Sequence, residues 1–260
     1  MFPSVSSAGS GAVSVGPSSL LCAGEKGDSV LSAETPLDQE PGQRLLQFLD
    51  LSPALSRPQY TSTSSHLSLP CSLLPHISWE QIKARGFREL HWSFIPTTAP
   101  VPQRLFSLSA GGPLTWKPDQ NKGLQPGTNL KKGDLSLRRN RGGKDDAGEY
   151  ICALEFENGV TLKRSVHVKL LHIVSSTGKE LISGQQLNLT CGLEQALPSD
   201  LHLKWFPPKQ PTLSDPRPSS PLIIPAVSTA DSGKWRCELW QNNTKLTWAE
   251  ITLEIGECPG

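Results

Sequence analysis

One short phrase occurs twice in this chain of 260 residues and limits the folds open to it. "DAGEYIC" ends at Cys152 and "DSGKWRC" ends at Cys237, so both read Asp-x-Gly-x-aromatic-x-Cys. Self-similarity at a fixed offset indicates duplicated units. The offset is 85 residues (237 minus 152), which suits a small β domain. We therefore expect two β domains.

Apolar and polar residues alternate around both copies of the phrase. Period-two alternation is typical of strands with one face on a core and one in solvent. The expected inward sets are Leu67, Leu69 and Cys71; Leu90, Trp92 and Phe94; Cys152, Leu154 and Phe156; Val166, Val168 and Leu170; Leu187, Leu189 and Cys191; Leu201, Leu203 and Trp205; and Cys237 with Leu239. The pattern predicts an all-β fold. We also expect a strand at 104–108 and one uninterrupted strand across 165–176, where no Gly or Pro occurs.

In each unit the order is Cys, then Trp, then the repeated phrase. This order resembles the immunoglobulin sandwich, in which a disulfide joins the two sheets and a Trp packs beside it. The resemblance implies disulfides Cys71–Cys152 and Cys191–Cys237, with Trp92 and Trp205 in the two cores. The alternative is that these four are buried free cysteines.

The aromatic residue of the phrase differs between the units. Tyr150 fits the tyrosine corner of immunoglobulin domains, whose hydroxyl binds the backbone a few residues upstream. Trp235 stands at that place in the second unit, where the indole N–H forms the contact differently or the corner is absent.

The spacing of the cysteines separates the two units. The first pair is 81 positions apart (152 minus 71), which resembles a variable-type domain with an insertion at 97–129. The second pair is 46 apart (237 minus 191), which resembles a compact, constant-like domain. We predict domains at 61–172 and 173–256, followed by a short C-terminal stump at 257–260. Residues 1–60, rich in Ser, Gly and Pro, are predicted to be a disordered tail.

The cysteines also bear on the compartment. No pair is Cys-x-x-Cys, so we expect no metal site, and disulfides indicate an oxidising compartment. Two sequons, at Asn188 and Asn242, agree with secretion and predict glycosylation. The first residues are a poor signal peptide, and no run of 18 apolar residues occurs. We expect an incomplete version of a longer precursor rather than a cytosolic protein. Cys22 and Cys258 receive no partner.

Composition and motifs exclude several functions. A net charge of +1 is too small to create the positive electrostatic field with which proteins attract nucleic acid. The six His are scattered, and nucleophile elbows and phosphate-binding glycine loops are missing from the sequence. We expect no catalytic residues, no cofactor and no metal ion.

Four stretches carry a more specific resemblance: "LPCSLLPHISWEQIKARGFRELHW", "QRLFSLSAGGPL", "GDLSL" with "DDAGEY", and "DSGKWRCELWQNNTKL". They are similar to the family of the lymphocyte-activation-gene-three protein and the helper T-cell co-receptor, over about 61–256. The insertion is shorter here than in that family. The resemblance implies an inhibitory T-cell co-receptor whose partner is MHC class II, membrane-anchored at the cell surface in its full-length form.

The same resemblance places recognition on the extra loop of the first domain. That loop corresponds to 97–129, where Arg104, Trp116 and Lys117 are the expected ligand-binding residues, since Arg and Trp are enriched among interface anchors. The alternative is that Trp116 packs on its own sheet and Arg104 is solvated. A soluble secreted decoy and a homophilic adhesion module are the competing functions. The sequence leaves the oligomeric state open.

Overall fold

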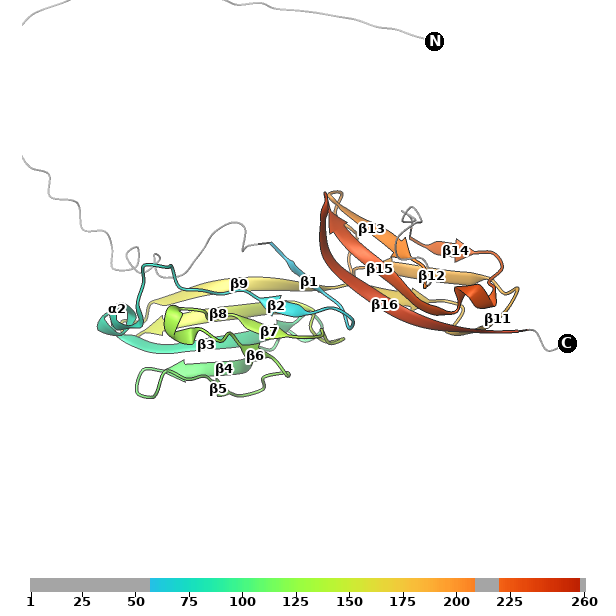
Figure 1. Ribbon diagram of the computed structural model, residues 1–260. Helices are drawn as coiled ribbons and strands as arrows, with labels where there is room; N and C mark the ends of the chain where they lie inside the picture. The colour runs from blue at the N-terminus through green and yellow to red at the C-terminus, as the bar shows by residue number, and fades with distance from the viewer. Residues whose placement is uncertain (1–56, 209–219, 258–260) are drawn as a thin grey trace, which may run out of the picture. The chain divides into compact units, whose positions relative to one another are not determined.

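The computed structural model of the chain describes residues 57–208 and 220–257. Strands dominate this part of the chain (Figure 1), so the all-β prediction is confirmed. The predicted tail up to residue 56, including Cys22, lies outside the described residues, as does Cys258 in the predicted stump. β1 nevertheless begins at Gln59, inside the predicted tail.

The described strands form four sheets. A six-stranded sheet has the order β1-β9-β8-β3-β4-β5 and a three-stranded sheet the order β2-β7-β6. Their bounds are β1 Gln59–Thr61, β2 Leu67–Leu69, β3 Phe87–Pro96, β4 Gln103–Ser109, β5 Lys117–Pro118, β6 Gln125–Pro126, β7 Leu137–Arg139, β8 Gly148–Phe156 and β9 Thr161–Leu170.

The remaining strands follow in two further sheets, ordered β11-β16-β15-β13 and β10-β12-β14. Their bounds are β10 His172–Ser175, β11 Glu180–Ile182, β12 Leu187–Gly192, β13 Leu201–Phe206, β14 Leu222–Ile224, β15 Gly233–Gln241 and β16 Thr244–Gly256. Two short 3-10 helices, η2 Leu130–Lys132 and η3 Thr229–Asp231, precede β7 and β15.

The apolar residues form two separate buried clusters. One spans Leu67 to Val168 and the other spans Leu171 to Ile255. The inward residues expected from the alternation are buried, because successive side chains of a strand point to opposite faces. Leu170 is the exception: it is half-buried at the end of β9. Trp92 and Trp205 are among the largest fully buried side chains, one in each cluster.

The expected strand across 165–176 is broken at Leu171. β9 ends at Leu170 and β10 begins at His172 in a different sheet. Leu171 is buried in the second cluster, and its N–H donates to the carbonyl of Thr61. The prediction of one strand was wrong because its only criterion was the lack of Gly and Pro. A change of sheet needs neither residue.

A short helix, α2 (Trp79–Ala84), lies where no helix was expected. Ser78 caps it through a capping box with Gln81, and Trp79 and Ile82 are buried. The indole N–H of Trp79 also donates to the carbonyl of Leu130, at 2.8 Å. Ser-x-x-Gln was therefore a readable start signal in the sequence.

The two expected cysteine pairs differ between the two clusters. Cys191 on β12 and Cys237 on β15 form a disulfide. Cys71 and Cys152 differ from the expectation, because both are buried free thiols. The two thiols are neighbours but no disulfide joins them. Burial, followed by the contact with Cys71, raises the pKa of the Cys152 thiol well above its ordinary value.

The aromatic residues of the phrase make the same contact in both units. The Tyr150 hydroxyl donates to the carbonyl of Asp146, at 3.2 Å. The Trp235 indole N–H donates to the carbonyl of Asp231, at 2.9 Å. Each bond reaches back four residues to the Asp that opens the phrase. The sequence left two alternatives open at Trp235, a corner formed by the indole or no corner. The structure contains the corner, which the indole forms.

Candidate binding face

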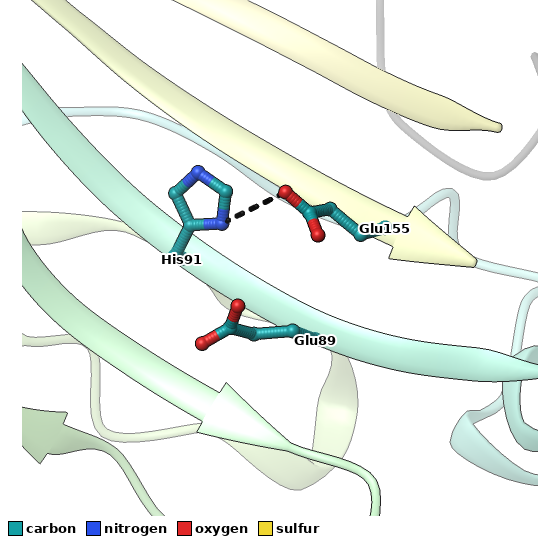
Figure 2. A group of neighbouring side chains, drawn as sticks. All are labelled: Glu89, His91 and Glu155. Atoms are coloured by element: carbon teal, nitrogen blue, oxygen red, sulfur yellow. Dashed lines mark ion pairs between the residues drawn. The ribbon is translucent and has the colours of Figure 1, made fainter. Parts of the chain in front are cut away.

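The outward face of the six-stranded sheet gathers charged side chains near its centre. Along β3, Leu90 and Trp92 point into the core, whereas Glu89 and His91 point outward and are half-buried. Figure 2 shows Glu89 and His91 on β3 beside Glu155, which comes from the neighbouring strand β8. The alternation that builds the core therefore also places these polar groups on one surface.

The strand register sets two carboxylates against each other. Glu89 pairs directly with Glu155 across β3 and β8. Like charges directly opposite on a sheet are destabilising. Each carboxylate here has an arginine partner. Arg104 on β4 donates to Glu89 Oε1 at 2.5 Å, and Arg88 donates to Glu155 Oε2. Arg88 can do this because it lies in a register shift between Phe87 and Glu89.

His91 occupies the next row of the same face. Its cross-strand neighbours are Ser107 on β4 and Ala153 on β8, which are both small. Its Nδ1 atom is buried without a hydrogen bond and lies 3.7 Å from Glu155 Oε1. Burial lowers the pKa of His91, and so do the charges of Arg104 and Lys163, against the opposing effect of Glu155 and Glu89. The imidazole is therefore neutral near pH 7.

Of the three expected ligand-binding residues, the structure brings two to this face. Arg104 is the partner of Glu89, so it is exposed but not freely solvated. Lys117 on β5 pairs with Ser107, which pairs with His91, so Lys117 lies in the same row. Lys163 on β9 extends that row beyond Ala153.

Trp116 lies on the other side of the sheet edge. It is half-buried against the first cluster, with its ring centroid 6.1 Å from that of Phe106 in an edge-on arrangement. Lys117 faces outward, so its neighbour turns inward. This packing matches the alternative left open for Trp116. It removes that side chain from the outward face.

Sequence reasoning missed Glu89, Glu155 and Arg88 as site residues. Alternation alone places Glu89 and His91 outward together. Glu155 joins them only through the pairing of β3 with β8, and Arg88 only through a bulge. Pairing register depends on contacts between distant segments and is not written in either strand.

The two sequon asparagines occupy different settings. Asn242 is exposed in the turn between β15 and β16, with a positive φ of 52°. Asn188 lies within β12, half-buried, opposite Ile223 of β14. Both lie in the second half of the chain, away from the row of His91 in sequence.

No protein-family model matches this chain. Among the described residues, none of the helices is both long and apolar enough to cross a lipid bilayer.

Proposed function

We propose that this chain is the ligand-binding part of an immune cell-surface receptor built from two immunoglobulin-like domains. Two features support the domain assignment. Each buried cluster contains a Cys pair with a buried Trp, and each has the corner bond at the start of its last Cys-bearing strand. These are the hallmarks of that fold.

The observation that carries the binding proposal is the half-buried, mixed-charge outward face of the six-stranded sheet. Arg88 and Arg104 pair with the carboxylates of Glu155 and Glu89, and Lys117 and Lys163 lie in the next row of the same face. Polar groups with fixed partners on a rigid sheet present a defined charge pattern, which gives specificity and steers a charged protein partner. The family resemblance makes MHC class II the proposed partner and T-cell inhibition the proposed outcome.

The direct test is binding of the secreted protein to matched cells with and without MHC class II. We expect binding only to the positive cells. Binding of equal strength to both cell types would refute this partner, and a comparison in solution with purified MHC class II would confirm the contact.

Variants of the face locate the site. Lys117→Glu and Arg104→Ala should each weaken binding about tenfold or more, equivalent to ~1.4 kcal/mol, because both residues lie on the outward face. The matched control is Lys179→Glu, an equally exposed lysine in the second half of the chain. Unchanged affinity in both face variants, with normal circular dichroism, would move the site elsewhere.

A further inference from the structure

The cluster at the centre of the outward face contains three potential metal ligands that protein binding leaves unexplained. Glu89, His91 and Glu155 each offer one ligand atom, and these atoms lie within 4.8 Å of one another. All three side chains are mostly buried, with 21%, 13% and 19% exposure respectively. The ion pairs of the two glutamates with Arg88 and Arg104 do not explain why the Nδ1 atom of His91 is buried beside them without a hydrogen bond.

The distance between His91 and Glu155 supports coordination rather than hydrogen bonding. Nδ1 and Oε1 lie 3.7 Å apart. N–H···O hydrogen bonds measure about 2.7–3.2 Å, so this gap is too wide for one. Two ligand atoms on a tetrahedral zinc ion, each bound at about 2.0–2.1 Å, are about 3.3 Å apart. The observed spacing of 3.7 Å is close to that value.

The arginines leave one oxygen of each carboxylate available. Arg104 engages Glu89 Oε1, and Arg88 engages Glu155 Oε2. Glu155 Oε1 is the atom that faces His91. In metal sites, ligating carboxylates are held by such outer hydrogen-bond partners, which fix the orientation of the ligand atom. Arg88 therefore positions Glu155 without occupying the oxygen that faces the imidazole, and Arg104 leaves Oε2 of Glu89 without an arginine.

We propose that Glu89, His91 and Glu155 bind a divalent transition-metal ion of the zinc type on the outward face of the six-stranded sheet. One imidazole nitrogen and two carboxylate oxygens are ligands that zinc accepts, and three protein ligands leave a fourth position open to water or to a group from a partner. The cross-strand neighbours of His91, Ser107 and Ala153, are small and add no charge beside the imidazole. The positive charges of Arg88 and Arg104 weaken the attraction for a cation, so we expect micromolar affinity rather than that of a structural zinc site.

The test is calorimetric titration of the purified full chain with zinc chloride, after treatment with EDTA and dialysis. We expect one saturable site. His91→Gln and Glu155→Gln should each weaken binding at least tenfold. Titration with cobalt chloride adds a second readout, because tetrahedral Co²⁺ absorbs in the visible range and reports coordination independently of stability.

The matched control is His167→Gln, which removes an exposed histidine on β9 and should leave zinc binding unchanged. Three outcomes would overturn the proposal: no saturable binding by the parent chain, unchanged binding by both cluster variants, or an equal loss in the control. Glu155→Gln is nearly isosteric, so it keeps the test valid if His91→Gln fails to fold. The titration contains no protein partner, so its outcome is independent of the receptor proposal.

Discussion

At the scale of single residues, His91 makes the stability of the folded chain depend on pH. Its pKa is lowered in the folded chain, chiefly by burial, so the unfolded chain binds a proton more readily. The free energy of unfolding then rises with pH wherever the unfolded state carries more protons. The stabilisation is present above the unfolded pKa of about 6.5 and is lost as pH falls through the lower folded value.

We therefore expect the parent chain to lose more stability between pH 7 and pH 5 than His91→Gln does. Urea unfolding at both pH values, with EDTA present, measures this difference. His167→Gln, at an exposed site, should behave like the parent. Equal losses in the parent and in His91→Gln would contradict the assignment.

Asp146 shows how one position of the repeated phrase stabilises the first cluster. Its carboxylate is only 2% exposed, accepts from Arg139, and accepts from the N–H of Gly143 at 2.6 Å. Removing one partner of a buried ion pair costs about 3–5 kcal/mol, because the other charge is left uncompensated. We expect Asp146→Asn to lower the free energy of unfolding by about that amount, measured by urea denaturation.

The second copy of the phrase provides the control. Asp231 caps η3 with Ser228 and is less buried, so Asp231→Asn should cost only about 0.5–2 kcal/mol. Arg139→Leu combined with Asp146→Asn should cost less than the sum of the single changes, since neither charge then remains unpaired. Additive effects would show that the two side chains do not act as a pair.

At the scale of elements, the segment 97–129 is part of the core rather than a removable loop. β4 within it pairs with β3 and buries Leu105, Phe106 and Leu108, and Leu124 is buried as well. Losing a buried Leu or Phe side chain costs about 2–5 kcal/mol, and domains are stable by only about 5–15 kcal/mol. We expect deletion of 97–129 to unfold the first cluster, with loss of near-ultraviolet circular dichroism.

A matched change in the β4–β5 connection should be tolerated. A Cβ at Gly111 would meet no atom within 4 Å, and one at Gly112 would meet only Ser109, at 3.9 Å or more. Inserting two serines between them should therefore leave melting and circular dichroism unchanged. A folded deletion variant, or an unfolded insertion variant, would contradict this assignment of the segment.

The sequence predicted the elements whose faces differ most. The inward sets along β2, β3, β8, β12 and β13 follow from alternation of single letters. The strand at β4 was expected as well, although its adjacent residues Leu105 and Phe106 are both buried and break the alternation. Short elements without a clear alternation of apolar and polar residues were not predicted. β5 and β6 have two residues each, and α2 has only six residues after its cap Ser78.

The candidate site could be predicted only in part from the sequence, because Glu155 lies beside Glu89 only through the pairing register of β3 and β8. The expectation of no metal site considered ligands close in sequence, whereas this cluster draws on two strands.

At the scale of the whole molecule, the cysteines report where the chain folds. Cys71 and Cys152 are buried neighbours, and the raised pKa of Cys152 keeps its thiol protonated and unreactive once folded. The structure holds no disulfide between them, and one could form only before burial, during folding in an oxidising compartment. We expect peptide mapping of secreted protein to find Cys71–Cys152 as well as Cys191–Cys237.

Protein folded in the cytosol and then exposed to oxidised glutathione should keep Cys71 and Cys152 as thiols. Cys191→Ala should lower the free energy of unfolding by about 2–5 kcal/mol. Free thiols at 71 and 152 in secreted material would remove the argument for a second bridge.

Glycans would mark the same compartment on the surface of the molecule. Asn242 is exposed in a turn and Asn188 lies on the half-buried face of β12. We expect Asn242→Gln and Asn188→Gln each to reduce the apparent mass of protein made in animal cells, and the double variant to match enzymatically deglycosylated protein. An unchanged band for either variant means that its sequon is unused.

The hydrogen bonds from Tyr150 and Trp235 show what the repeated phrase requires at its aromatic position. A phenol and an indole differ in size and in the atom that carries the proton, yet both reach the same kind of acceptor four residues back. The position thus requires an aromatic side chain that is long enough to donate a hydrogen bond to that carbonyl, and it does not require one particular ring. A sequence pattern that requires Tyr at this position would detect only one of the two units. Exchange of Tyr for Trp is therefore one way in which duplicated domains lose sequence similarity while they keep the same fold.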